Sequence, residues 1–175
     1  MSPEATSDNL SPEAISENIS PEATSDNLSP KAATGTLSPE AARAELARRA
    51  EAIEGGYELM LGYAAQGLHS DQGAANSGQL RDHLTRFADA LTGLPGVYRD
   101  CAKALGVGPQ DALDGFLEVL SRDAAATQAA LRLLLGQSGI SSQMVDNVNA
   151  SIHVRALLTD VFVVDEIIKH AGSIT

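Results

Sequence analysis

The sequence has little of several residue types, and each shortage narrows what the protein can be. It contains one cysteine, Cys101, and no tryptophan, and aromatic residues make up only 3% of its 175 residues. One cysteine forms no internal disulfide and no multi-thiolate zinc site within the chain, which favours a reducing compartment. Apolar residues still make up 43% of the chain. The core must therefore be built from Leu, Ala, Val and Ile, which suits close packing of helices.

Long apolar runs and basic residues are also scarce. The longest uninterrupted apolar run is 161–164, far below the roughly 20 residues that span a bilayer. The N-terminus has neither the basic nor the apolar region of a secretory signal. Twelve Lys and Arg stand against 23 Asp and Glu, for a formal net charge of −11. Such an acidic surface repels phosphate backbones and anionic lipids, so we expect a cytoplasmic protein that binds neither nucleic acid nor membrane.

Residues 2–46 contain five copies of a nine-residue unit, which read SPEATSDNL, SPEAISENI, SPEATSDNL, SPKAATGTL and SPEAARAEL. Ser-Pro is typical of a helix start, but the early copies continue with weak helix formers and meet another proline after nine residues. Helices this short do not form alone, so we predict that residues 1–37 are a disordered tail. Two alternatives stay open. One is phosphorylation of the Ser-Pro serines, and the other is docking on a partner through Leu10, Ile19, Leu28 and Leu37.

The remainder, residues 38–175, is predicted to form a helical bundle. After Ser38 the fifth repeat turns into strong helix formers, and apolar residues recur at 3-4 spacing to about Gln66, through a weak point at Gly55-Gly56. The same spacing predicts three further long helices and one short helix, over about 77–92, 97–105 (the short one), 109–135 and 142–170. No alternating strand pattern appears. The fold class is therefore all-α, with four long helices plus one short helix in a bundle.

The last predicted helix, 142–170, is the most apolar stretch of the chain. Its 3-4 seam consists of Val154, Leu157, Val161, Val164 and Ile168, and its apolar flank of Ala156, Val163 and Ile167. An apolar arc this wide indicates a helix that is buried on several sides. We therefore expect it at the centre of the bundle, in contact with the other long helices.

Asp160 falls inside that apolar arc. A buried carboxylate without a partner is costly, so we expect Asp160 either to pair with an arginine of another helix or to mark a ligand pocket. The candidate arginine partners are Arg48, Arg49, Arg86 and Arg132. His153, just ahead of the apolar part, is either a ligand for haem or a metal or a plain structural residue. Asp160 and His153 are thus the candidate cofactor-binding residues, while no catalytic residue, metal site or cofactor is assigned.

Sequence motifs for enzyme chemistry are missing. A di-iron bundle needs Glu-x-x-His on two helices, and no Glu-x-x-His occurs in the chain. Glycine-rich phosphate loops and the Gly-x-Ser-x-Gly elbow are also absent. Cys101 has no histidine nearby in sequence and is interpreted as a small core residue.

Residues 101–120 resemble a helix-turn-helix with its turn at Gly106. The helix that would enter the DNA groove, however, offers acidic side chains before its first basic residue, Arg122. We therefore predict a non-enzymatic protein-protein interaction factor, such as an adaptor, assembly or regulatory protein, and leave open whether it is a homo-oligomer. The alternative is a bundle that holds a small molecule or cofactor, with or without enzyme activity. A helix-turn-helix transcriptional regulator is the third hypothesis.

Overall fold

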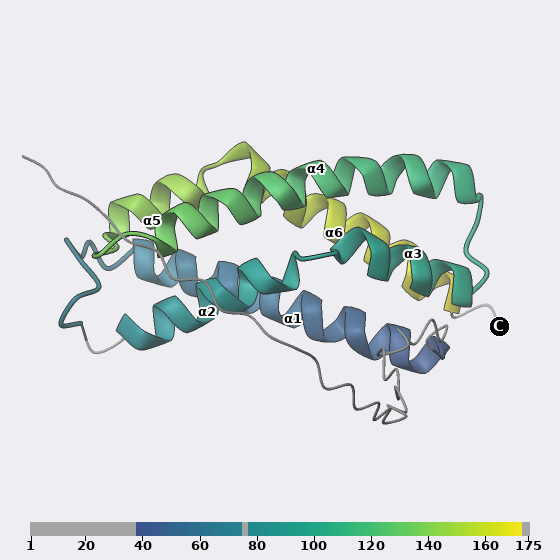
Figure 1. Cartoon of the computed structure of the whole chain (residues 1–175), viewed down its shortest axis with the longest axis horizontal. Helices are drawn as coiled ribbons and strands as arrows, with labels where there is room; N and C mark the ends of the chain where they lie inside the picture. The colour runs from purple at the N-terminus through teal and green to yellow at the C-terminus, as the bar shows by residue number, and fades with distance from the viewer. Residues whose placement is uncertain (1–37, 75–76, 173–175) are drawn as a thin grey trace, which may run out of the picture. The chain divides into compact units, whose positions relative to one another are not determined.

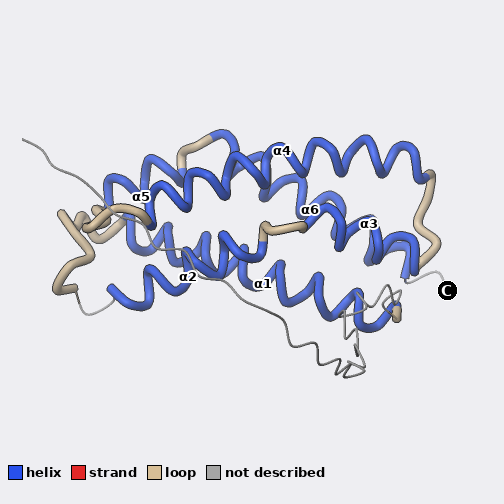
Figure 2. The backbone as a smooth tube through the Cα atoms, in the orientation of Figure 1, coloured by secondary structure: helices blue, strands red, loops and turns tan. Residues whose placement is uncertain are grey.

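The computed structural model describes residues 38–74 and 77–172, and it confirms the all-α bundle. The described residues form six helices and no strand (Figures 1 and 2). The helices are α1 (Pro39–Ala64), α2 (Ser77–Ala90), α3 (Leu94–Ala104), α4 (Gln110–Leu135), α5 (Ser142–Asn149) and α6 (Ile152–Gly172). None of these helices has an apolar stretch long enough to cross a membrane. The predicted disordered tail, with its docking and phosphorylation alternatives, lies outside the described residues.

Helix α1 begins where the capping signature predicts. The Ser38 hydroxyl accepts a hydrogen bond from the Ala41 N–H at 3.2 Å, and Pro39 occupies the first turn, where its missing N–H costs nothing. The helix continues unbroken through Gly55 and Gly56. A Cβ atom on Gly56 would lie 2.9 Å from the Cβ and Cδ1 atoms of Phe87 in α2. The second glycine therefore lets α1 and α2 approach closely.

Burial follows the predicted 3-4 spacing most fully in α2, α4 and α6, whereas along α1 buried and half-buried residues alternate. In α4 the seam is buried along its whole length, at Leu113, Leu117, Leu120, Ala124, Thr127, Leu131 and Leu134. In α2 the buried seam is Leu80, Leu84 and Phe87, and Leu91 in the turn that follows continues it. The five seam residues of the last helix, from Val154 to Ile168, are buried as well. Because these side chains repeat every three to four residues, each helix places one stripe against its neighbours.

The single helix predicted over 142–170 is wrong, because the chain breaks there into α5 and α6. Ser141 caps α5 by accepting a hydrogen bond from the Met144 N–H, and Ala150 and Ser151 separate the two helices. The Ser151 hydroxyl then accepts from the His153 N–H at the start of α6. The stretch around the break holds two asparagines and a serine, which favour caps and turns over helix interiors.

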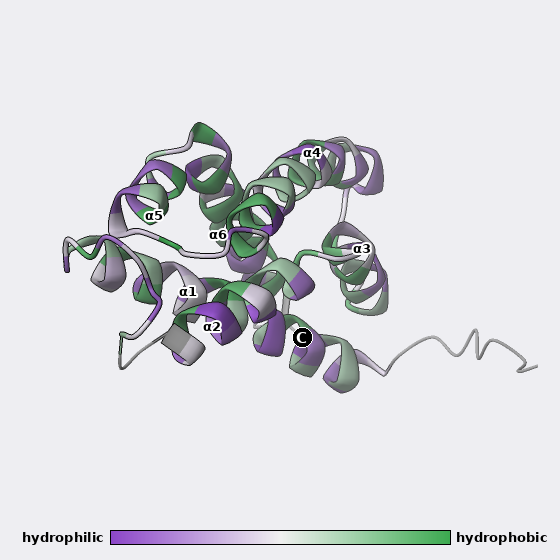
Figure 3. Cartoon of the chain, turned by 60° about the vertical axis from the view of Figure 1, so that its left-hand side comes forward, coloured by the Kyte–Doolittle hydropathy of each residue, from purple (hydrophilic) through white to green (hydrophobic). Residues whose placement is uncertain are grey.

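The expectation that the last helix is the centre of the bundle is also wrong. Helix α1 contacts α2, α3 and α5, whereas α6 packs mainly along α4, antiparallel to it (Figure 1). Along the predicted apolar flank of α6, Val163 and Ile167 are exposed, and so is the neighbouring Phe162. Figure 3 shows green hydrophobic residues where the helices face one another and purple hydrophilic ones on the outward turns of α1 and α2. The break after α5 therefore frees α6 to cover α4 and leaves one of its apolar sides on the surface.

Candidate functional site

Asp160 is only partly buried, and it faces another acid. Asp123 of α4 lies close enough to shift the titration of Asp160, whose Oδ2 atom is buried and has no hydrogen-bond partner among the described residues. The expected arginine partner is wrong, since none of the ion pairs in the described part of the chain involves Asp160. Asp160 does border a hollow of about 710 Å³, whose wall includes Tyr57 of α1 and Arg155. Its predicted cofactor-binding role stays a prediction.

Burial raises the pKa of Asp160 above its ordinary value, and the nearby charge of Asp123 raises it further. A folded-state pKa above the unfolded one means that the native protein binds its proton more tightly than the unfolded chain does. The contribution of Asp160 to stability is therefore fully present below the unfolded pKa, near 4, and is lost as the pH rises through the folded pKa.

Replacing Asp160 by asparagine should stabilise the protein at pH 7. The amide carries no charge, so the variant avoids the cost of keeping a charge at this partly buried position beside Asp123. The gain should shrink as the pH is lowered from 7 to 4, because the native carboxyl group takes up its proton more readily than an ordinary aspartate does. Urea unfolding at the two pH values measures this, with the exposed Asp111→Asn as the control. A variant less stable than the parent at pH 7 would show that the charged form of Asp160 is stabilised instead.

His153, at the start of α6, also lies next to Asp123. Its Nδ1 atom lies 3.5 Å from Oδ1 of Asp123, and its side chain is more than half exposed. Asp123 thus has both candidate residues, Asp160 and His153, as neighbours. The described residues hold no group of three His, Cys, Asp or Glu side chains arranged to bind a metal ion.

The fully buried carboxylate of the described chain is Asp71, which the sequence did not single out. Asp71 lies in the loop between α1 and α2 and accepts a hydrogen bond from Arg81 Nε at 2.7 Å. It accepts another from the backbone N–H of Ile140, also at 2.7 Å, in the loop between α4 and α5. Burial alone would raise the pKa of Asp71, but these bonds outweigh it and hold the pKa below its ordinary value.

The residues around Asp71 form one hydrogen-bonded cluster at this end of the bundle. Arg81 also donates to the carbonyl oxygens of Leu135, Gln137 and Ser138. Tyr63 donates its hydroxyl proton to the Ile140 carbonyl at 2.7 Å, and Ser142 donates to the Tyr63 carbonyl at 2.6 Å. The Ser142 N–H donates to the Leu68 carbonyl oxygen, and the Leu68 N–H donates to the Ser142 hydroxyl, which completes the cluster. Its polar groups are satisfied by one another, so it joins α1, α2 and two loops and has a structural role.

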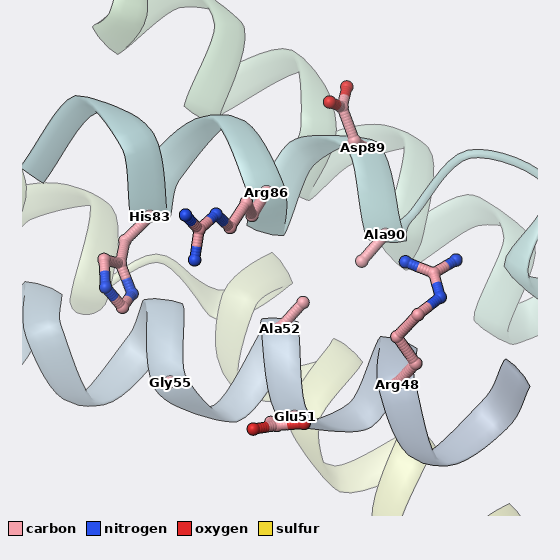
Figure 4. Close-up of a pocket in the computed structure, with 8 residues that line it drawn as sticks. All are labelled: Arg48, Glu51, Ala52, Gly55, His83, Arg86, Asp89 and Ala90. Carbon is pink, nitrogen blue, oxygen red and sulfur yellow. The ribbon is translucent and has the colours of Figure 1, made fainter. Parts of the chain in front are cut away.

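A second surface feature is the groove between α1 and α2 (Figure 4). It encloses about 510 Å³ and is lined by Arg48, Glu51, Ala52, Gly55, His83, Arg86, Asp89 and Ala90. His83 lies half-buried in the wall of this groove. Because four of these residues come from each helix, the helical periodicity of either one alone does not reveal the groove.

A third feature is the α4–α6 apolar surface, by which we mean Phe116, Val119, Val163 and Ile167. Val119 and the two α6 residues are exposed, and Phe116 is half-buried. Phe116 and Ile167 line a small hollow of about 190 Å³ together with Val107 and Pro109 of the turn before α4. Single apolar residues scattered over a surface are normal, whereas these residues lie together on two adjacent helices beside one hollow.

The segment that resembles a helix-turn-helix forms α3, a turn and the start of α4. Its early α4 residues Asp111 and Glu118 are exposed, while Leu113 and Leu117 face the core. Cys101 is fully buried in α3, and burial raises the pKa of its thiol, as expected of a core residue. The helix-turn-helix regulator stays a third, untested hypothesis beside the prediction that the protein does not bind nucleic acid.

Comparison of the chain with protein family models, with curated proteins and with solved structures found no match.

Proposed function

We propose that this protein is a non-enzymatic protein-protein interaction factor that engages its partner through the α4–α6 apolar surface. The observation that carries the proposal is the side of α6 on which Val163 and Ile167 are exposed, next to Phe116 and Val119 of α4. Each exposed apolar side chain favours burial by roughly 25 cal/mol per Å² of surface removed from water. A partner that covers these side chains therefore gains binding free energy from their burial.

The shape of the surface favours a helical partner. Beside Ile167, the turn before α4 and the first turns of α4 form a hollow that is small enough for one apolar side chain. An amphipathic helix places apolar residues at i, i+3, i+4 and i+7, so one can enter the hollow while others cover Val163 and Val119. Such a partner would make this protein an adaptor, assembly or regulatory factor.

Charge favours a basic partner over a second copy. The chain carries a formal net charge of −11, so two copies repel each other before their apolar surfaces meet. Exposed acids stand next to the apolar residues in sequence, Glu118 before Val119 and Glu166 before Ile167. We therefore propose a basic amphipathic helix of another protein as the occupant. The single buried cysteine suits a reducing compartment, so a cytoplasmic partner is proposed.

A helical peptide of leucine and lysine in amphipathic order is a direct probe of this surface. The full chain should bind it saturably, and Ile167→Ser should weaken binding by about tenfold, because the loss of one well-covered apolar anchor costs over 1 kcal/mol. Fluorescence anisotropy of a labelled peptide measures this. The matched control is Ile152→Ser, the same substitution on the same helix at a side chain that is 75% exposed.

Four outcomes overturn parts of the proposal. Unchanged binding in both serine variants would show that the peptide binds by charge alone, and equal loss in both would show that the α4–α6 apolar surface is not the specific site. Equal binding of a leucine-glutamate peptide would remove the basic character of the partner. Concentration-dependent dimerisation of the full chain that Ile167→Ser abolishes would identify a second copy as the occupant.

The alternative function, a bundle that holds a small molecule, is favoured by one observation. The groove between α1 and α2 presents basic side chains around an open floor of small residues. It is independent of the α4–α6 apolar surface, which lies on other helices.

A further inference from the structure

The groove between α1 and α2 has a floor of small side chains. Ala52 and Gly55 of α1 and Ala90 of α2 line it. A Cβ atom added to Gly55 would meet nothing within 4 Å, whereas one added to the adjacent Gly56 would collide with Phe87. Gly56 therefore allows the two helices to pack together, and Gly55 leaves the space beside that contact open.

The basic and acidic side chains that line the groove point in different directions. In Figure 4 the imidazole ring of His83 and the guanidinium group of Arg86 lie in the gap between the two helices. Glu51 and Asp89 extend away from the gap, on opposite sides. Nitrogen donors thus face the interior of the groove, and the carboxylates lie outside it.

Arg86 has all its donors available. Within the described part of the chain it makes no hydrogen bond and no ion pair. The neighbouring arginines differ, since Arg48 and Arg49 both bind the carboxylate of Glu45, whose pKa their hydrogen bonds lower to about 2. Arg49 also donates to the carbonyl oxygen of Ala90 at 2.9 Å. An unoccupied guanidinium beside an imidazole presents the planar fork that recognises oxyanions.

We propose that this groove binds a small molecule through an oxyanion group, a phosphate or a carboxylate, held by Arg86 and His83. The guanidinium donates two parallel N–H bonds to two oxygens, and the imidazole donates a third. The remainder of the ligand lies over Gly55 and Ala52, where about 510 Å³ is open to it. The net charge of −11 repels anions at long range, but salt screens that field beyond about 10 Å. Local hydrogen bonds therefore decide the affinity.

Inorganic phosphate and succinate are the probes, each titrated into the full chain and followed by ¹H–¹⁵N NMR, including the Arg86 side-chain Nε–H. We expect saturable shifts for at least one probe, centred on residues of the groove. Arg86→Gln should weaken binding by about tenfold or more, the ratio that corresponds to losing hydrogen bonds from a charged donor. Binding of phosphate alone identifies a phosphoryl ligand, and binding of succinate alone identifies a carboxylate ligand.

Two further variants separate a built site from general charge attraction. Arg132→Gln removes another exposed arginine without a partner among the described residues, on α4, and should leave binding unchanged. Gly55→Leu keeps every charge but fills the open floor, so it should abolish binding while the helix content by circular dichroism stays the same. Equal losses in the two arginine variants, or unchanged binding in Gly55→Leu, would overturn the proposal. Saturable binding of neither probe would overturn it as well.

Discussion

Replacing Asp71 by alanine is expected to lower the free energy of unfolding by about 3–5 kcal/mol, the range for breaking a buried ion pair. The Asp71 side chain is 1% exposed, and its oxygens bind Arg81 and the Ile140 N–H. Without the carboxylate, the Arg81 guanidinium loses its partner while still facing the carbonyl oxygens of the loop that follows α4. Urea unfolding followed by circular dichroism measures the loss.

Asp114→Ala is the matched control for Asp71→Ala. The Arg99–Asp114 pair has the same 2.7 Å distance from arginine Nε to carboxylate oxygen, but the Asp114 side chain is 50% exposed. Exposed pairs contribute about 0–1 kcal/mol, so this variant should stay close to the parent protein. If the two alanine variants lose equal stability, burial is not what makes the Asp71 pair important. If Asp71→Ala does not fold, Asp71→Asn, which keeps the shape, tests the same pair.

The lowered pKa of Asp71 also determines how its contribution to the free energy of unfolding changes with pH. Because the folded pKa lies below the ordinary value, the stabilisation is present above the unfolded pKa, near 4, and is lost as the pH falls through the folded pKa. Asp160 acts in the opposite direction, since its pKa is raised. The parent protein should therefore lose the Asp71 contribution on acidification, whereas the Asp71→Asn variant has none to lose.

Substituting alanine at the two adjacent glycines of α1 should have opposite effects. Gly56→Ala places a methyl group 2.9 Å from Phe87, which is fully buried and has no room to move. Overpacking of this kind costs about 1–3 kcal/mol, more than the gain in helix propensity returns. Gly55→Ala meets nothing within 4 Å and should stabilise the helix by about 0.5–1 kcal/mol.

The pair Gly56→Ala and Gly55→Ala can be compared in one set of thermal or urea melts. Adding Phe87→Ala to Gly56→Ala removes the Cγ and Cδ1 atoms that the new methyl group meets and leaves only Cβ, so the double variant should recover stability relative to the sum of the two single changes. Equal stabilisation by both alanines would show that α1 and α2 do not approach as closely as the structure has them.

The seams of the helices were predictable because burial repeats with the helical period. Every seam position of α4 proved buried, including the polar Thr127, and the seam of α6 did too. The flank of α6 was not predictable in the same way. Val163 and Ile167 are as apolar as their buried neighbours, and whether another helix covers them depends on the break between α5 and α6.

The polar cluster at Asp71 could not be predicted from the sequence, for a different reason. Its partners are 10 residues away at Arg81 and 69 residues away at Ile140, and one partner is a backbone N–H that no residue type reveals. Asp160 was singled out from its place on the helical wheel, and its Oδ2 atom is indeed buried. Asp123 was not predicted as the neighbour of Asp160, because the register of α4 against α6 determines that Asp123, and not an arginine, lies opposite Asp160.

Partner capture with matched variants tests most directly the proposal that the protein binds its partner through the α4–α6 apolar surface. The parent chain, the double variant Val163→Ser with Ile167→Ser, and Ile152→Ser are each immobilised as full chains and exposed to the same cell lysate. Partners that are captured by the parent and by Ile152→Ser should be lost by the double variant, and they should carry a basic amphipathic helix. Capture of the same partners by all three chains would contradict the proposed surface.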